Sequence, residues 1–143
     1  MEIHFGEAAK RHWIDALFLR ENKRLPNADQ LFGFSAECAL KAAMVSMGAP
    51  TKAEGDLSEK RHWQHIDALW AEFQAFAAGR RGSRVLSALA GFTVNPFLDW
   101  HASQRYGSDS FSPSGTALDR HWKACRACLV ALERAAGETW GGL

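Results

Sequence analysis

Apolar residues recur at helical spacing in several stretches of the chain, and breaks rich in glycine, proline and small polar residues separate them. The pattern predicts four main helices and one short one, at residues 5–22, 27–48, 61–78, 116–137 and, for the short helix, 84–91. Only residues 92–94 show a weak alternation of the kind found in strands. We therefore expect an all-α fold, an antiparallel up-and-down bundle of four main helices plus a short fifth.

The second predicted helix, residues 27–48, is the most apolar. Pro26 marks its start, and Gly48 followed by Pro50 marks its end. Its apolar side chains run almost all the way round, which is typical of a helix at the centre of a bundle. Long loops are expected at 49–59 and 103–115.

Length, charge and apolar runs limit the class of protein. The 143 residues fit a single domain, 1–143, and the net charge of +1 excludes a strong overall attraction for nucleic acid. No apolar run is long enough to cross a membrane, and the first residues do not resemble a signal peptide, so we expect a cytoplasmic protein. Six Trp and nine Phe are many for one small core, which favours a homodimer that buries helix faces.

The cysteines and histidines offer candidate metal ligands. Cys125 and Cys128 form a Cys-x-x-Cys pair, with His121 one helical turn earlier. A zinc site of this kind needs a second pair elsewhere, and Cys125 continues an apolar stripe. We therefore expect both cysteines to pack in the core and expect no metal or other cofactor. Most of the six histidines are expected to be solvated or to cap helices.

A tripeptide, Arg-His-Trp, occurs three times, at residues 11–13, 61–63 and 120–122. A duplicated ligand surface is one interpretation. The other is that helix starts favour a charge outside and a Trp inside, and this interpretation is preferred because the register between the first two copies slips by two residues.

Glu37 is the first candidate functional residue, since it lies in an otherwise apolar helix and a buried carboxylate needs a partner. Lys41, four residues later, stands in the favourable order for an ion pair. One hypothesis places this pair on the solvent-exposed stripe of the helix. The other turns Glu37 into a polar inlet, where it meets an arginine from a loop.

The best candidate for that arginine is Arg105. Residues 99–107 combine aromatic and basic side chains in a predicted loop, and Trp100 and Tyr106 could stack on bases while Arg105 holds a phosphate. We expect both aromatic rings to dock on the bundle and draw Arg105 toward Glu37. Asp99 is expected to cap its own turn.

Three segments together resemble the HEPN superfamily: Asn27–Met44, with its Gly-x-x-Ala-Glu-Cys-x-Leu-Lys core, His65–Trp70 and Trp100–Tyr106. Members of this superfamily are small prokaryotic helical bundles, and they are often dimeric. The resemblance implies RNA-cutting toxins or defence effectors, as in toxin–antitoxin systems, or partners of a minimal nucleotidyltransferase. Active members carry an Arg, four to six further residues and then a His, and they cut RNA without metal at a dimer cleft.

This chain departs from that catalytic pattern, because no histidine follows Arg105 until His121. RNA cleavage through the 2′-hydroxyl needs a group that exchanges protons near neutral pH. The first hypothesis is therefore a non-catalytic module that binds RNA, a nucleotide or a protein. Its predicted ligand-binding residues are Glu37, Lys41, Trp100, Arg105 and Tyr106. The alternative is a metal-independent endoribonuclease in which His101 replaces the missing histidine beside Arg105.

Overall fold

The computed structural model describes residues 1–143, and its regular secondary structure is all helical, with one isolated bridge between Thr51 and Leu57 as the only β feature. The α-helices are α1 (Phe5–Glu21), α2 (Leu25–Ser46), α3 (Ile66–Ala78), the short α4 (Ser83–Leu86) and α5 (Gly115–Ala136). Three 3-10 turns complete the set: η1 (Lys60–His62), η2 (Ser87–Leu89) and η3 (Ala102–Tyr106). The predicted all-α bundle is confirmed. None of the helices is both long enough and apolar enough to span a lipid bilayer.

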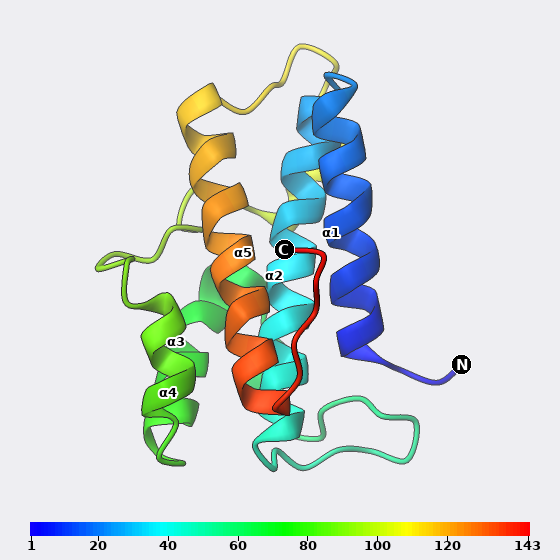
Figure 1. The fold of residues 1–143 in the computed structure, drawn as a ribbon. Helices are drawn as coiled ribbons and strands as arrows, with labels where there is room; N and C mark the ends of the chain where they lie inside the picture. Colours follow the sequence, from blue (N-terminus) through cyan, green and yellow to red (C-terminus); the bar gives the residue numbers. More distant parts are fainter.

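Helix α2 is the centre of the bundle, as predicted, because 13 of its 22 residues are buried. It packs against α1, α3 and α5, which surround it in Figure 1. The core also takes in Cys125 and Cys128, both fully buried on α5, which confirms that these cysteines pack in the core. Burial in apolar surroundings raises the pKa of Cys125 to about 12, so this thiol stays protonated.

The directions of the helices follow from contacts along α2. Helices α1 and α2 are joined by a short turn and run antiparallel (Figure 1). Helix α5 runs in the same direction as α2: the start of α2 meets the start of α5 through Asp29 and His121, and the ends of both line one cavity through Ser46 and Ala136. The long connection 47–114 makes this possible, since it carries the chain back to the starting end of the bundle.

The predicted third helix, 61–78, begins later than expected. Residues 60–62 form η1, and α3 starts only at Ile66. The intervening Trp63 donates from its indole nitrogen to the Leu57 carbonyl at 2.6 Å, and His62 is fully buried. These side chains hold the loop against the bundle. A continuous helix over residues 61–78 would point them in other directions and lose these contacts.

Most aromatic side chains pack either in the core of a single copy of the chain or, partly buried, against it. Seven of the Trp and Phe residues are buried: Trp13, Trp70, Trp100, Phe32, Phe73, Phe76 and Phe97. The number of aromatic residues therefore gives no reason of its own to expect a second copy. The large apolar side chains that remain exposed include Ile14 and Phe18, one turn apart on α1.

Candidate functional site

Glu37 lies in a buried polar cluster on α2. Its side chain is only 9% exposed; Oε1 accepts from Lys41 Nζ at 2.8 Å, and Oε2 lies 3.0 Å from Nδ1 of His65. His12 of α1 and His65 flank the half-buried ring of Phe34 on the same face. The carboxylate is therefore satisfied by Lys41 and His65, and the hypothesis of a simple solvent-exposed pair does not describe it.

The predicted ion pair between Arg105 and Glu37 is wrong. Arg105 is exposed on η3, and its guanidinium carbon lies 4.9 Å from the centre of the neighbouring Tyr106 ring. Tyr106 is 76% exposed, so it does not dock on the bundle as expected. The physical reason is that Glu37 already has two nearer partners and that a guanidinium can stay in water at little cost.

Trp100 does dock on the bundle, as expected, but its side chain is so fully buried that no ligand can reach it. The residue is fully buried, and its indole nitrogen donates to the Asp29 carbonyl at 3.1 Å. It lies edge-on to Phe34 and directly over Gly33 of α2. The interpretation of Trp100 as a base-stacking residue is therefore wrong, and its role is to anchor the segment that leads into η3.

A chain of charged side chains that the sequence analysis did not anticipate joins α2, α5 and the 96–100 turn. Asp29 Oδ1 lies 2.6 Å from Nδ1 of His121, and Nε2 of His121 lies 2.8 Å from Asp99 Oδ1. Arg120 donates to both oxygens of Asp99, at 2.7 and 2.9 Å, and to the Pro96 carbonyl at 2.8 Å. We call these residues the α2–α5 clamp. Asp99 therefore pairs with α5, and the expectation that it caps its own turn is wrong.

The clamp holds His121 in its doubly protonated form. Burial alone would lower the pKa of His121, but the hydrogen bonds and charges of Asp29 and Asp99 outweigh it, and the pKa is raised. Hydrogen bonds from Arg120, joined by His121, likewise hold the pKa of Asp99 well below its usual range. Since both ring nitrogens of His121 face carboxylates, neither has a lone pair free to accept a substrate proton. The clamp is suited to fastening helices rather than to proton transfer.

His121 and His62 are buried and are exceptions to the expectation that most histidines are solvated or capping, whereas His4, His65 and His101 are exposed. His4 does cap α1, by accepting from the Glu7 amide at 3.4 Å. His62 is fully buried instead, and neither of its ring nitrogens has a hydrogen-bond partner. Desolvation lowers its pKa, so it is held as a neutral ring edge-on to Phe76.

The backbone of η3, which carries the exposed side chains, is anchored to the bundle. Gln30 of α2 donates to the Ala102 carbonyl at 3.2 Å, and the buried Trp100 precedes the turn. His101 begins the turn, and its Nδ1 lies 3.6 Å from Asp67 Oδ2. His101 is the N-cap residue before the helical turn and has an extended backbone, so it pairs with Gln104 and does not share the helical register of Arg105. The backbone amide of His101 indeed donates to the Gln104 side chain at 3.1 Å.

The chain matches no family model, and neither a curated protein nor a solved structure is significantly similar to it. The site is therefore described from its own geometry. The sequence contained one signal for the clamp: Asp29, like Glu37, is an acid within an apolar helix and needs a buried partner. That partner was the histidine of the third Arg-His-Trp copy.

Proposed function

We propose that the chain is a non-catalytic, HEPN-like helical module that binds single-stranded RNA or a nucleotide through η3. The observation that carries the proposal is an arginine without a carboxylate partner that lies over an exposed tyrosine, on a turn anchored to the central helix. A guanidinium of this kind is available to a phosphate, and the outer face of the Tyr106 ring is available to a base.

The anchoring of η3 supports binding for an energetic reason. Association costs free energy for every side chain or loop that must become ordered. The hydrogen bond from Gln30 and the burial of Trp100 fix the η3 backbone before any ligand arrives. Only the Arg105 and Tyr106 side chains then remain to be ordered.

The ribonuclease alternative has weaker support. It requires His101 and Arg105 to act on one phosphate, whereas His101 faces Asp67 and Arg105 lies over Tyr106. The one histidine of α5, His121, has a carboxylate at each ring nitrogen. A binding function needs neither histidine.

The proposal is tested by fluorescence anisotropy with a labelled single-stranded RNA oligonucleotide over a series of salt concentrations. Arg105→Ala is expected to weaken binding about tenfold and to reduce the slope of log K against log salt by about one unit, since one phosphate contact is lost. Tyr106→Ala is expected to weaken binding by about 1–3 kcal/mol, with little change in the salt slope.

Arg126→Ala is the matched control, because Arg126 is also exposed but lies on α5. It should bind RNA as the wild type does. Equal losses in Arg105→Ala and Arg126→Ala would show unspecific attraction and contradict the proposal. Incubation with total RNA, with and without a chelator, tests the ribonuclease alternative. RNA cleavage by the wild type that is lost in His101→Ala would contradict the non-catalytic proposal and support the ribonuclease.

The partners belong to the same proposal. The HEPN resemblance implies a second copy of the chain or a nucleotidyltransferase-type protein, within a cytoplasmic toxin–antitoxin or defence system. Ile14 and Phe18 on the outer face of α1, 55% and 64% exposed, offer an apolar surface for the homodimer.

A further inference from the structure

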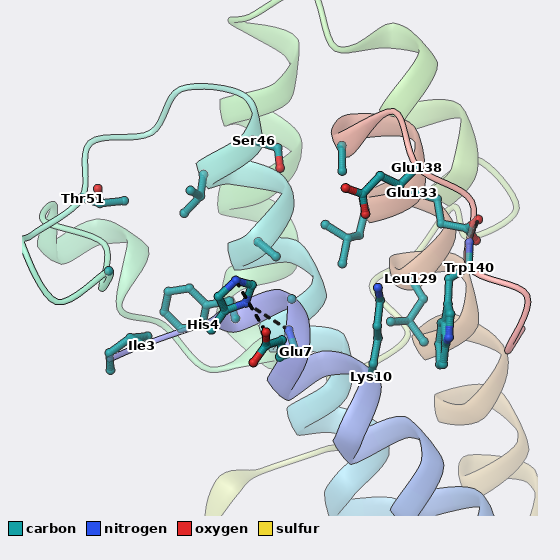
Figure 2. Close-up of a pocket in the computed structure, with 17 residues that line it drawn as sticks. Ile3, His4, Glu7, Lys10, Ser46, Thr51, Leu129, Glu133, Glu138 and Trp140 are labelled. Atoms are coloured by element: carbon teal, nitrogen blue, oxygen red, sulfur yellow. Dashed lines mark hydrogen bonds and ion pairs between the residues drawn. The ribbon is translucent and has the colours of Figure 1, made fainter. Parts of the chain in front are cut away.

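A cavity of about 470 Å³ lies at the end of the bundle where α2 and α5 terminate. This volume is within the range of about 300–1,000 Å³ that small-molecule sites occupy. Figure 2 shows its walls: the N-terminal segment with Ile3 and His4 on one side, and the end of α5 with Trp140 on the other. The cavity is remote in the fold from η3, which packs near the start of α2.

The floor of the cavity is apolar. Side chains of the central helix and of α5 form it, among them Ala42, Val45, Leu129 and Leu132, while Phe5 and Trp140 add aromatic walls. The indole of Trp140 is held in place because its backbone amide donates to Glu133 Oε2 at 2.9 Å. Such a floor favours an apolar body over an entirely polar ligand.

The rim of the cavity is negatively charged. Glu7, Glu133 and Glu138 line it, against a single lysine, Lys10. Lys10 does not neutralise these carboxylates at short range: its Nζ lies over the Trp140 ring, 5.7 Å from the centre. Glu7 has only a loose contact with His4, at 4.0 Å, and neither Glu133 nor Glu138 pairs with a lysine or arginine.

The helix directions add to this charge. Because α2 and α5 run in parallel, both carboxyl-terminal ends, with Ser46 and Ala136, face the cavity. Each contributes about half a negative charge, while the start of α1 offsets one of them. Acidic side chains and helix ends together therefore select for positive charge.

We propose that this cavity binds an organic cation with an apolar body, of which an alkylammonium is the simplest representative. The apolar chain lies on the floor between α2 and α5, and the ammonium group lies at the Glu133 and Glu138 side of the rim. This site is independent of the RNA-binding proposal for η3, so either can fail without the other.

The test compares three probes of equal chain length: octylammonium, octanol and octanoate. Isothermal titration calorimetry measures the affinity, and tryptophan fluorescence reports on Trp140. Octylammonium is expected to bind most tightly, octanol more weakly and octanoate not at all, because only the head-group charge differs. Equal or tighter binding of octanoate overturns the proposal, as does the absence of octylammonium binding to the folded protein.

Two variants separate charge from shape. The double variant Glu133→Gln/Glu138→Gln keeps an oxygen that can accept from the Trp140 amide, and it should weaken octylammonium binding by about tenfold while leaving octanol unchanged. Val45→Phe, at a lining position that is 38% exposed, fills part of the cavity and should weaken the binding of both probes. Unchanged octylammonium affinity in the double variant contradicts the charge selection.

Glu21→Gln is the matched control, since Glu21 is exposed at the opposite end of α1. It should bind all three probes as the wild type does. Circular dichroism melts of every variant show whether the fold is intact. If the double variant is unfolded, the single variant Glu138→Gln replaces it in the test. The Glu138 side chain has no partner in the structure, and we expect this variant to lose less octylammonium affinity than the double variant.

Discussion

Gly33 is the residue at which α2 and the 96–106 segment approach most closely. An added Cβ there would overlap the indole of Trp100, which is itself fully buried and bonded to Asp29. Gly33→Ala in a helix interior would ordinarily stabilise the protein by about 0.5–1 kcal/mol. Here the overlap reverses the sign, and we expect a loss of about 2–3 kcal/mol in urea unfolding.

Gly91→Ala is the control for this prediction, because a Cβ at Gly91 meets no atom within 4 Å. It should leave the free energy of unfolding nearly unchanged. A Gly33→Ala protein as stable as the wild type would mean that Trp100 does not pack on Gly33.

His62 makes the protein sensitive to acid. Its pKa is lowered by burial, despite opposing effects of Glu59 and Glu72, so the unfolded chain takes up a proton near pH 6.5 before the folded chain does. Stability is therefore lost as the pH falls below about 6.5. His62→Phe preserves the edge-on contact with Phe76 and should be no less stable at neutral pH. Thermal melts between about pH 7 and pH 5 should show a shallower decline for the variant.

His121 acts in the opposite direction. Its folded pKa is raised, so its contribution is fully present below about pH 6.5 and is lost as the pH rises through the folded value. The stability difference between the wild type and His121→Gln should therefore shrink as the pH is raised from about 6.5 through the folded pKa. A difference that is constant over this range would contradict a charged His121 between Asp29 and Asp99.

At the scale of elements, the α2–α5 clamp holds α2, α5 and the 96–100 turn together. Asp29 and His121 are each only 1% exposed on their side chains. Asp29→Asn leaves the protonated His121 with one carboxylate fewer in a buried site, and we expect a loss of about 3–5 kcal/mol. Chemical denaturation measures this loss.

Asp119→Asn is the matched control on α5, the helix that carries His121. Its ion pairs with Arg20 and Lys123 are largely exposed, and exposed pairs contribute about 0–1 kcal/mol. Similar losses for Asp29→Asn and Asp119→Asn would show that the clamp adds no more than an ordinary surface pair.

At the scale of the whole molecule, we predict that two copies of the chain associate. Most aromatic rings pack in the core or, partly buried, against it, so the dimer prediction now depends on Ile14 and Phe18 and on the HEPN resemblance. Light scattering at micromolar concentration should give the mass of two chains, and Phe18→Ser should reduce it to one. Leu98→Ser, at another apolar position with 61% exposure, should leave the mass unchanged.

The helices themselves could be predicted because their information is local. Apolar spacing and the breaks at Pro26, Gly48 and Pro50 placed α1, α2 and α5 within a few residues of their observed ends. The central place of α2 followed from its apolar surface on nearly all sides. These properties depend on neighbours three or four positions apart, which the sequence displays directly.

The partners of the charged residues were decided only by the tertiary structure. The sequence offered Lys41 as a partner of Glu37, but it did not show that His65 would be the second partner while Arg105 stays in water. The parallel course of α2 and α5 brings Asp29 to His121, which are 92 positions apart, and brings two helix ends to one cavity. Pairings of this kind depend on how whole helices pack, and packing sums many weak contacts that no local pattern contains.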